Sequence, residues 1–224
     1  MLKLKNQKIG FSLAEVLITL GIIGIIAAIT IPSLITKYQK QRTVTQLKKT
    51  YSVLQQAIKM ASEEYGDCEG WEYNLTGEEF IKRYFLPYLK ATEVNMPLTY
   101  TDLKGVVQKD TSHPKIMLND GSIIMYIHTK EGFECKNHLV VDLNGSAGPN
   151  RLGRDVFILS FFENILTTYT QYKQPSLSTH ENLIKPGTSG QCSRQANGGV
   201  LGPGSYCSRL IEVDSWSISK DYPW

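Results

Sequence analysis

The stretch GFSLAEVLITLGIIGIIAAITIPSL, residues 10–34, is almost free of charge and holds one carboxylate, Glu15, near its start. A helix over residues 11–31 rises about 30 Å, which matches the hydrocarbon core of a bilayer. The leader before it is basic, with Lys3, Lys5 and Lys8, and a short basic flank stays in the cytoplasm. The sequence therefore predicts one membrane span with its N-terminus inside and the remainder outside.

Glu15 distinguishes three interpretations of this span. A secretory signal peptide would have a shorter apolar segment and a clearer small-residue site than the one near Ala27. An uncleaved signal anchor leaves the cost of a carboxylate in lipid unexplained. If a peptidase cuts between Gly10 and Phe11, however, the new α-amino group of one chain can meet Glu15 of a neighbour whose helix is shifted slightly along the axis. The cost is then relieved only in the correct stagger.

The stretch KIGFSLAEVLITLGIIGIIAAITIPSL closely resembles the N-terminus of type IV prepilins and of the pseudopilins of type II secretion systems. The resemblance implies that a prepilin peptidase cleaves after Gly10 and methylates the new N-terminal Phe11. It also implies that Glu15 acts in subunit recruitment and that the helix bends at Pro32. The last point agrees with the backbone hydrogen bond that proline cannot donate.

This resemblance implies a structural subunit that is stored in the bacterial inner membrane, with its head outside the cytoplasm. It would assemble into a type II secretion pseudopilus or a type IV pilus. Its partners would be other pilin or pseudopilin subunits, the prepilin peptidase and the inner-membrane assembly platform. The alternatives are a minor pilin acting in adhesion or DNA uptake, and a membrane-anchored extracytoplasmic binding protein. An adhesive head would suit the aromatic residues, although each could equally pack in a core: Trp71, Tyr73, Trp216 and Trp224.

Composition excludes some other classes of protein. The chain has 24 basic and 21 acidic side chains, and the leader lysines account for the excess, so no basic stripe predicts nucleic-acid binding. No G-x-S-x-G, H-E-x-x-H or phosphate-cradling glycine loop is present, which argues against an enzyme. The histidines are scattered without ligand spacing, at His113, His128, His138 and His180.

The sequence predicts four segments: a leader at 1–10, a transmembrane half-helix at 11–32, an amphipathic half-helix at 33–66 and a head at 67–224. In the amphipathic half, apolar residues recur at alternating spacings of three and four, which is typical of one buried helix face. Gly66 suits the end of this helix, because glycine accepts the left-handed conformation. The stripe comprises Val44, Leu47, Tyr51, Leu54, Ile58, Ala61 and Tyr65.

The head combines a short helix with strands. Residues 76–90 predict a helix capped by Thr76, with an aromatic cluster that we expect in the core. Asn119-Asp120-Gly121 predicts a hairpin between strands at 115–118 and 122–129, and the segments HLVVDL and DVFILSFF predict a third and a fourth strand. The predicted fold class is α+β, with the long helix packed on an antiparallel sheet in a pilin-like arrangement.

The segment DLNGSAGPNRLGRDVF lies between the third and fourth strands. Its oxygen-bearing side chains are Asp142, Asn144, Asn150 and Asp155, and hard cations such as Ca²⁺ need an oxygen cage of this kind. The spacing departs from an EF-hand, and a plain glycine-rich turn explains the loop as well. No other cofactor is expected.

The four cysteines, Cys68, Cys135, Cys192 and Cys207, favour two disulfides in an oxidising compartment, although four buried thiols are an alternative. The segment between Cys192 and Cys207 resembles the disulfide-bounded C-terminal loop of pilins. That resemblance pairs these two residues and leaves Cys68 with Cys135, while three connectivities are formally possible.

Overall fold

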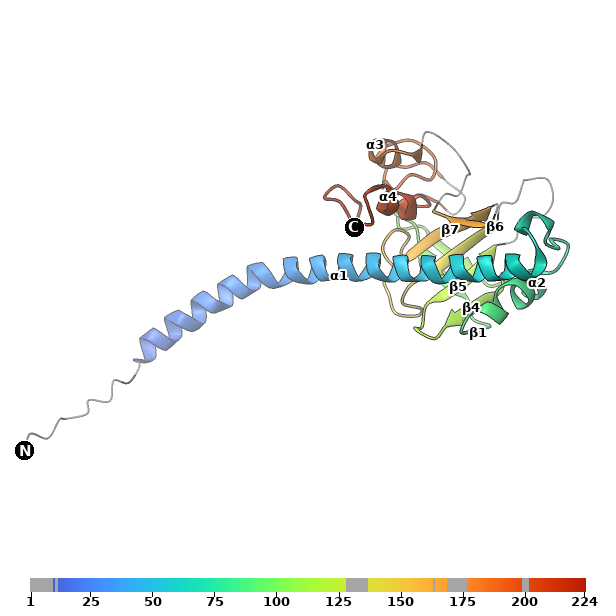
Figure 1. Cartoon of the computed structure of the whole chain (residues 1–224). Coiled ribbons are helices and arrows are strands. Elements are labelled where there is room, and N and C mark those ends of the chain that lie inside the picture. The colour runs from blue at the N-terminus through green and yellow to red at the C-terminus, as the bar shows by residue number, and fades with distance from the viewer. Residues whose placement is uncertain (1–9, 11, 128–136, 163, 169–176, 199–201) are drawn as a thin grey trace, which may run out of the picture. The chain divides into compact units, whose positions relative to one another are not determined.

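The computed structural model describes residues 10, 12–127, 137–162, 164–168, 177–198 and 202–224. The chain divides into two compact units, Met1–Lys40 and Gln41–Trp224. Helix α1 runs from Leu13 to Tyr65 and contributes to both units (Figure 1). It stays helical through Pro32, so a bend at that residue remains a prediction.

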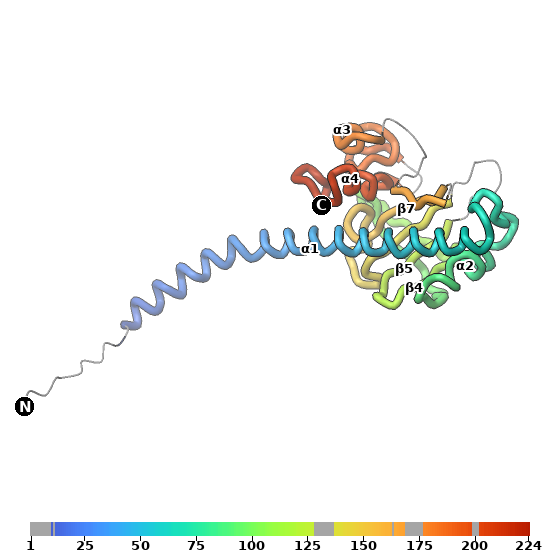
Figure 2. The backbone as a smooth tube through the Cα atoms, in the orientation of Figure 1, coloured from blue at the N-terminus to red at the C-terminus, as the bar shows by residue number. Residues whose placement is uncertain are grey.

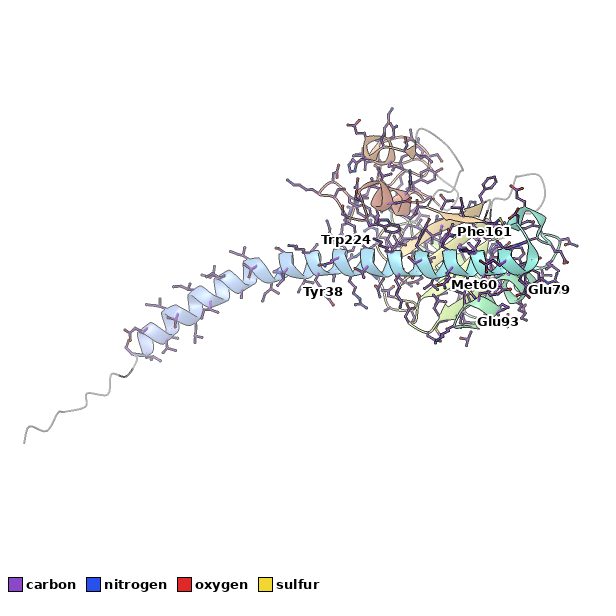
Figure 3. All side chains as sticks on the ribbon, in the orientation of Figure 1. Tyr38, Met60, Glu79, Glu93, Phe161 and Trp224 are labelled. Atoms are coloured by element: carbon purple, nitrogen blue, oxygen red, sulfur yellow. A yellow bond between two sulfur atoms is a disulfide. The ribbon has the colours of Figure 1, made fainter. Side chains whose placement is uncertain are left out.

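In the first unit, the apolar side chains of α1 from Leu13 to Ile35 are exposed (Figure 3). This part of α1 is long and apolar enough to cross a membrane, and none of it is buried inside the protein. A helix that is apolar all round is ordinarily covered by lipid or by other helices.

In the second unit, α1 buries one face in the main hydrophobic core. The predicted stripe is confirmed at Leu47, Leu54, Ile58 and Ala61, which are all buried, whereas Tyr65 at its end is 43% exposed. Gly66 follows with φ of 79°, a left-handed conformation that ends the helix as predicted. The second half of α1 lies across the strands of the main sheet (Figure 1).

The main sheet has six strands in the order β1-β4-β5-β6-β7-β8, and every neighbouring pair is antiparallel. Strands β2 (Leu98–Thr101) and β3 (Val107–Asp110) form a separate two-stranded sheet. The predicted hairpin is confirmed, because Gly121 lies between β4 and β5 with φ of 86°. The six strands are β1 (Ala91–Glu93), β4 (Lys115–Leu118), β5 (Ile123–Ile127), β6 (Asn137–Asp142), β7 (Val156–Phe162) and β8 (Ile165–Thr167).

The central strands are apolar without alternation because both of their faces are covered. On β6, Leu139 belongs to the main core with α1, whereas Val140 belongs to a second core that also contains residues of β2. On β7, Leu159 and Ile158 divide between the two cores in the same way. Strands buried on both sides read as continuous hydrophobic runs, which explains HLVVDL and DVFILSFF.

Helix α2 (Gly77–Tyr84) begins with the predicted cap. Thr76 Oγ1 accepts from the Glu79 N–H, and Glu79 Oε2 accepts from the Thr76 N–H at 2.9 Å. The helix ends at Tyr84, earlier than the predicted range, and a 3₁₀ turn containing Pro87 follows. Proline removes a backbone donor there.

The last part of the head contains two short helices, α3 (His180–Ile184) and α4 (Cys207–Val213). A disulfide joins Cys192 to Cys207, which confirms the predicted pair. Ser208 of α4 donates its hydroxyl to the carbonyl of Ile158 at 2.6 Å, so α4 is tied to β7 (Figure 2). Cys68 is buried, and Cys135 lies outside the described residues, so a bridge between them stays a prediction.

Candidate functional site

The first turn of α1 is closed by its own side chains. Ser12 precedes the helix, and its N–H and hydroxyl donate to Glu15 Oε2 at 2.8 and 2.9 Å. The Glu15 N–H donates back to Ser12 Oγ at 3.3 Å. This is a capping box, in which two helix-end groups satisfy each other. The S-x-x-E pattern was present in the sequence, but the role of Ser12 was not predicted.

The predicted cleavage site adjoins this capping box. Gly10 is exposed and precedes the helix, while Phe11 lies outside the described residues. Glu15 follows on the first turn. Cleavage after Gly10, methylation of Phe11 and recruitment through Glu15 therefore stay predictions that this geometry leaves intact.

The four predicted oxygen ligands lie at the end of β6 and in the loop between β6 and β7. Asp155 is occupied by backbone donors, because its two carboxylate oxygens accept from the N–H groups of Arg151 and Asn150 at 2.6 and 2.9 Å. Asp142 is fully buried, and its Oδ1 accepts from the Asn144 N–H at 3.2 Å. Burial, with a smaller effect from the charge of Asp155, raises the pKa of Asp142 to about 7.

Three oxygen atoms of residues 142–155 accept no hydrogen bond from the described part of the chain. They are Oδ2 of Asp142, Oδ1 of Asn144 and Oδ1 of Asn150, and each is sealed from solvent. Buried acceptors normally have a partner, and leaving one without a partner costs about 1–3 kcal/mol. Among the described residues, no three His, Cys, Asp or Glu side chains gather around a point. A cation here would therefore depend on amide and backbone oxygens as well as on Asp142.

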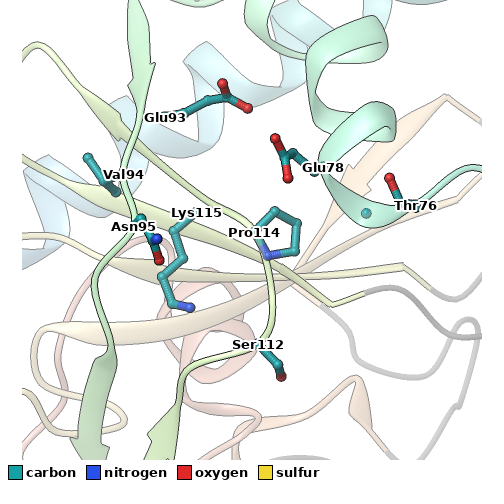
Figure 4. A pocket seen from close by; sticks show the side chains of 9 residues that line it. Thr76, Glu78, Glu93, Val94, Asn95, Ser112, Pro114 and Lys115 are labelled. Carbon is teal, nitrogen blue, oxygen red and sulfur yellow. The ribbon is translucent and has the colours of Figure 1, made fainter.

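A hollow of about 580 Å³ lies beside the start of α2 (Figure 4). Its charges are paired within the protein, because Lys115 Nζ lies 2.9 Å from Asp110 Oδ1 and Lys82 lies 2.6 and 3.4 Å from Glu78 and Glu93. Burial opposes ionisation of Asp110, but the hydrogen bonds from His113 and Lys115 outweigh it and lower the pKa of Asp110 to about 2. The cation that lines this hollow, Lys115, is therefore already paired, and the two lining carboxylates share Lys82.

A second hollow, of about 690 Å³, is lined by four cations and no carboxylate. They are Lys104, Arg151, Arg154 and Arg194. We call it the basic hollow. Sequence analysis missed it because its residues come from distant parts of the chain.

The aromatic residues do not form an exposed platform. Trp71 is only 4% exposed and stacks on Tyr84 with ring centroids 4.3 Å apart, so of its two predicted positions the core position is confirmed and the surface position is wrong. Tyr73, Trp216 and Trp224 are half-buried against the main core. The predicted core position of the aromatic cluster of α2 is confirmed by Phe80 and Tyr84.

Three of the histidines have separate partners. His113 contacts Asp110, His138 contacts Ser160 at 2.8 Å, and His180 lies between two carboxylates. His180 Nδ1 is 2.7 Å from Asp214 and Nε2 is 2.8 Å from Asp221. The bond to Asp221, aided by Asp214 and opposed by burial, raises the pKa of His180. His128 lies outside the described residues.

Comparison with known proteins gives two family matches. Residues 33–224 match a family described as "Family of unknown function (DUF6613)", and residues 5–31 match the "Prokaryotic N-terminal methylation motif". No curated protein and no solved structure matches the chain.

Proposed function

Because the chain belongs to the DUF6613 family and its methylation motif makes it a type IV pilin-like prepilin, we propose that it is a structural filament subunit. In this proposal it is stored in the inner membrane, processed by a prepilin peptidase and assembled through α1 into a type II secretion pseudopilus or a type IV pilus. The observation that carries the proposal is the exposed apolar part of α1 with one carboxylate at its start.

The two parts of α1 differ in what covers them, which supports separate roles in the head and in assembly. From Leu47 to Ala61 the helix is fastened to the sheet by buried side chains, whereas from Leu13 to Ile35 its apolar side chains are exposed. Lipid covers such a surface in storage, and neighbouring copies of the helix cover it in a filament. Packing of this kind between identical helices is heterologous and open-ended.

In this proposal the carboxylate of Glu15 changes its hydrogen-bonding partner when the subunit is cleaved and assembled. Before cleavage its carboxylate accepts two hydrogen bonds from Ser12. Cleavage after Gly10 creates the α-amino group of Phe11, which is a cation at nearly the same depth. A neighbouring subunit that presents this amine replaces the neutral partner of the carboxylate with a cation, and two opposite charges attract each other far more strongly in a low-dielectric surrounding than in water.

Substitution of Glu15 tests the assembly role. Glu15→Ala should insert in the membrane and be cleaved normally, yet be absent from filaments sheared from cells, as measured by immunoblot of sheared and membrane fractions. Ser12→Ala is the matched control, because it removes the hydroxyl that bonds to Glu15 and keeps both the Ser12 backbone N–H and the carboxylate. We expect this control variant to enter filaments. Incorporation of Glu15→Ala at the wild-type level would contradict the proposal.

We also propose that the loop at 142–155 binds Ca²⁺. Three buried oxygens without donors, on Asp142, Asn144 and Asn150, support this second proposal, since Ca²⁺ prefers carboxylate, amide and carbonyl oxygens. The ion would fasten the β6–β7 connection and leave filament assembly to α1.

Thermal unfolding of the full chain in detergent tests the Ca²⁺ proposal. Ca²⁺ in excess over EGTA should raise the melting temperature, because a ligand at 100 times its Kd adds about 2.7 kcal/mol. Asp142→Asn should abolish the rise, and Asp120→Asn, which alters an exposed carboxylate paired with Lys49, should keep it. An equal rise with Mg²⁺, or none with either ion, would count against a Ca²⁺ site.

A further inference from the structure

The basic hollow differs from the hollow beside α2 in how its charges are balanced. None of its four cations lies within 4.0 Å of a side-chain carboxylate in the described part of the chain, and only Arg194 contacts the main-chain oxygen of the last residue, Trp224. The cation that lines the other hollow, Lys115, is paired with Asp110. The charges of Lys104, Arg151 and Arg154 are therefore not neutralised by a carboxylate of the described residues. From this contrast we propose that the basic hollow binds a phosphate group.

Two arginines of the hollow, Arg151 and Arg154, are positioned by neutral groups. Arg151 donates from Nη2 to the carbonyl of Leu103 at 3.0 Å, and its Nε is buried without a hydrogen-bond acceptor. The guanidinium of Arg154 lies over the ring of Trp224, 5.3 Å from its centroid. Arg194 donates to the main-chain oxygen of Trp224 at 3.2 Å. The proposal accordingly depends on Lys104, Arg151 and Arg154 more than on Arg194.

Two carboxylates that are close in sequence to cations of the hollow, Asp102 and Asp155, accept hydrogen bonds from the backbone. Asp102 is 3% exposed, and its Oδ1 accepts from the N–H groups of Lys104 and Val106 at 2.8 and 2.9 Å. Asp155 accepts from the N–H groups of Asn150 and Arg151. Both carboxylates stabilise the backbone that carries the cations, and neither forms an ion pair with them.

The walls of the hollow are held together before any ligand arrives. The Thr101 N–H donates to the carbonyl of Asn150, and the Leu152 N–H donates to the carbonyl of Thr101, both at 2.8 Å. The Leu103 N–H donates to the carbonyl of Pro203 at 3.1 Å. Binding therefore needs little ordering of the backbone, and this lowers the entropic cost of capture.

Phosphate fits this arrangement better than a carboxylate does. A carboxylate has two oxygens and one charge, which suit a single guanidinium fork. A phosphate group offers more oxygens and up to two charges, so it can contact several cations at once. The source of the phosphate is either a phospholipid headgroup or a soluble phosphate compound, and the two share this chemistry.

Calorimetric titration of the full chain in a non-ionic detergent tests the proposal. One arm uses inorganic phosphate, and the other uses short-chain phosphatidylglycerol, with phosphatidylcholine as its zwitterionic comparison. Binding in either arm, weakened by added NaCl, supports a phosphate site, and the tighter arm identifies the source. Absence of heat in both arms would overturn it.

Charge variants locate the binding within the head. Lys104→Gln and Arg151→Gln should each weaken binding about tenfold, as loss of a charge-assisted hydrogen bond predicts. Lys109→Gln, which removes an exposed charge on β3 outside the hollow, should leave the affinity unchanged. Lys104 is exposed, so its variant should fold even if the Arg151 variant does not. Equal affinities for Lys104→Gln, Lys109→Gln and the wild type would overturn the assignment.

Discussion

Replacement of both Cys192 and Cys207 by alanine should lower the free energy of unfolding of the head by about 3 kcal/mol. The two residues are 15 apart in sequence and joined by a disulfide. The chain-entropy relation gives about 3 kcal/mol for a loop of this length at 25 °C. Both side chains are buried, at 1% and 0% exposure, so alanine introduces no unpaired polar group.

This loss converts to a measurable change in melting temperature. For a folded unit of roughly 150–250 residues, 1 kcal/mol shifts the midpoint by about 2–4 °C. The double variant should therefore melt roughly 6–12 °C below the wild type, as followed by circular dichroism of the full chain in detergent. Amide hydrogen exchange should also become faster between residues 192 and 207. Without the disulfide, this segment opens more often, and backbone hydrogen bonds such as that from the Gly204 N–H to the Gln191 carbonyl then break more often.

The comparison needs a control that keeps the bridge. Ser193→Ala lies in the same segment and removes only the acceptor of one local hydrogen bond, from the Gln195 N–H. Its melting temperature should stay near that of the wild type. Adding a reductant would be a poorer way to open the Cys192–Cys207 bridge than the double variant, because it would also act on the predicted bridge between Cys68 and Cys135. A double variant that melts within about 1 °C of the wild type would refute the loop-closure reasoning.

Three further outcomes are expected. Leu54→Ala should destabilise the head by about 2–5 kcal/mol in urea unfolding, because Leu54 is fully buried, and Leu54→Met should cost less than about 1.5 kcal/mol; equal costs would argue against a cavity. The raised pKa of His180 means that its two carboxylate bonds stabilise fully below the unfolded pKa of about 6.5 and are lost as pH rises through the folded value. The melting temperature of the wild type relative to His180→Gln should therefore fall across that range, and a constant difference would be inconsistent with it. Gly10→Leu should retain the leader, and intact-mass measurement of a shortened chain would show the cleavage assignment to be wrong.

The long elements of the head could be predicted from the sequence because their side-chain periods are clear. The stripe of α1, the helix cap at Thr76 and the turn at Gly121 each have a local physical cause that is visible in a few residues. Strands β6 and β7 were found from their apolar runs, and the structure adds the reason for these runs in the two cores that cover them.

The remaining elements were missed because they are short. Strands β1 and β8 have three residues each, and α3 and α4 have five and seven. A period of 2 or 3.6 residues cannot be recognised over such lengths, and tertiary contacts decide these segments instead. Ser208, for example, ties α4 to β7 through a hydrogen bond between residues 50 apart in sequence.

The candidate sites likewise include some that could be predicted from local sequence and some that depend on tertiary contacts. The processing site and the loop at 142–155 are continuous in sequence, so their residues could be listed in advance. The sequence did not reveal which oxygens of that loop lack a donor, because this depends on how Asp155 is occupied by the backbone. The basic hollow is lined by Lys104, Arg151 and Arg194, which are far apart in sequence. No local sequence pattern predicts that these residues lie close together.

The short outer strands of the six-stranded sheet limit how copies of this protein can join. Among the described residues, β1 and β8 are the two edges, and each has three residues in the strand. An edge so short is a poor template for a strand donated by another molecule. Joining of copies by strand exchange is thus disfavoured at both of these edges, and in the proposed filament each new copy would have to be recruited through side chains.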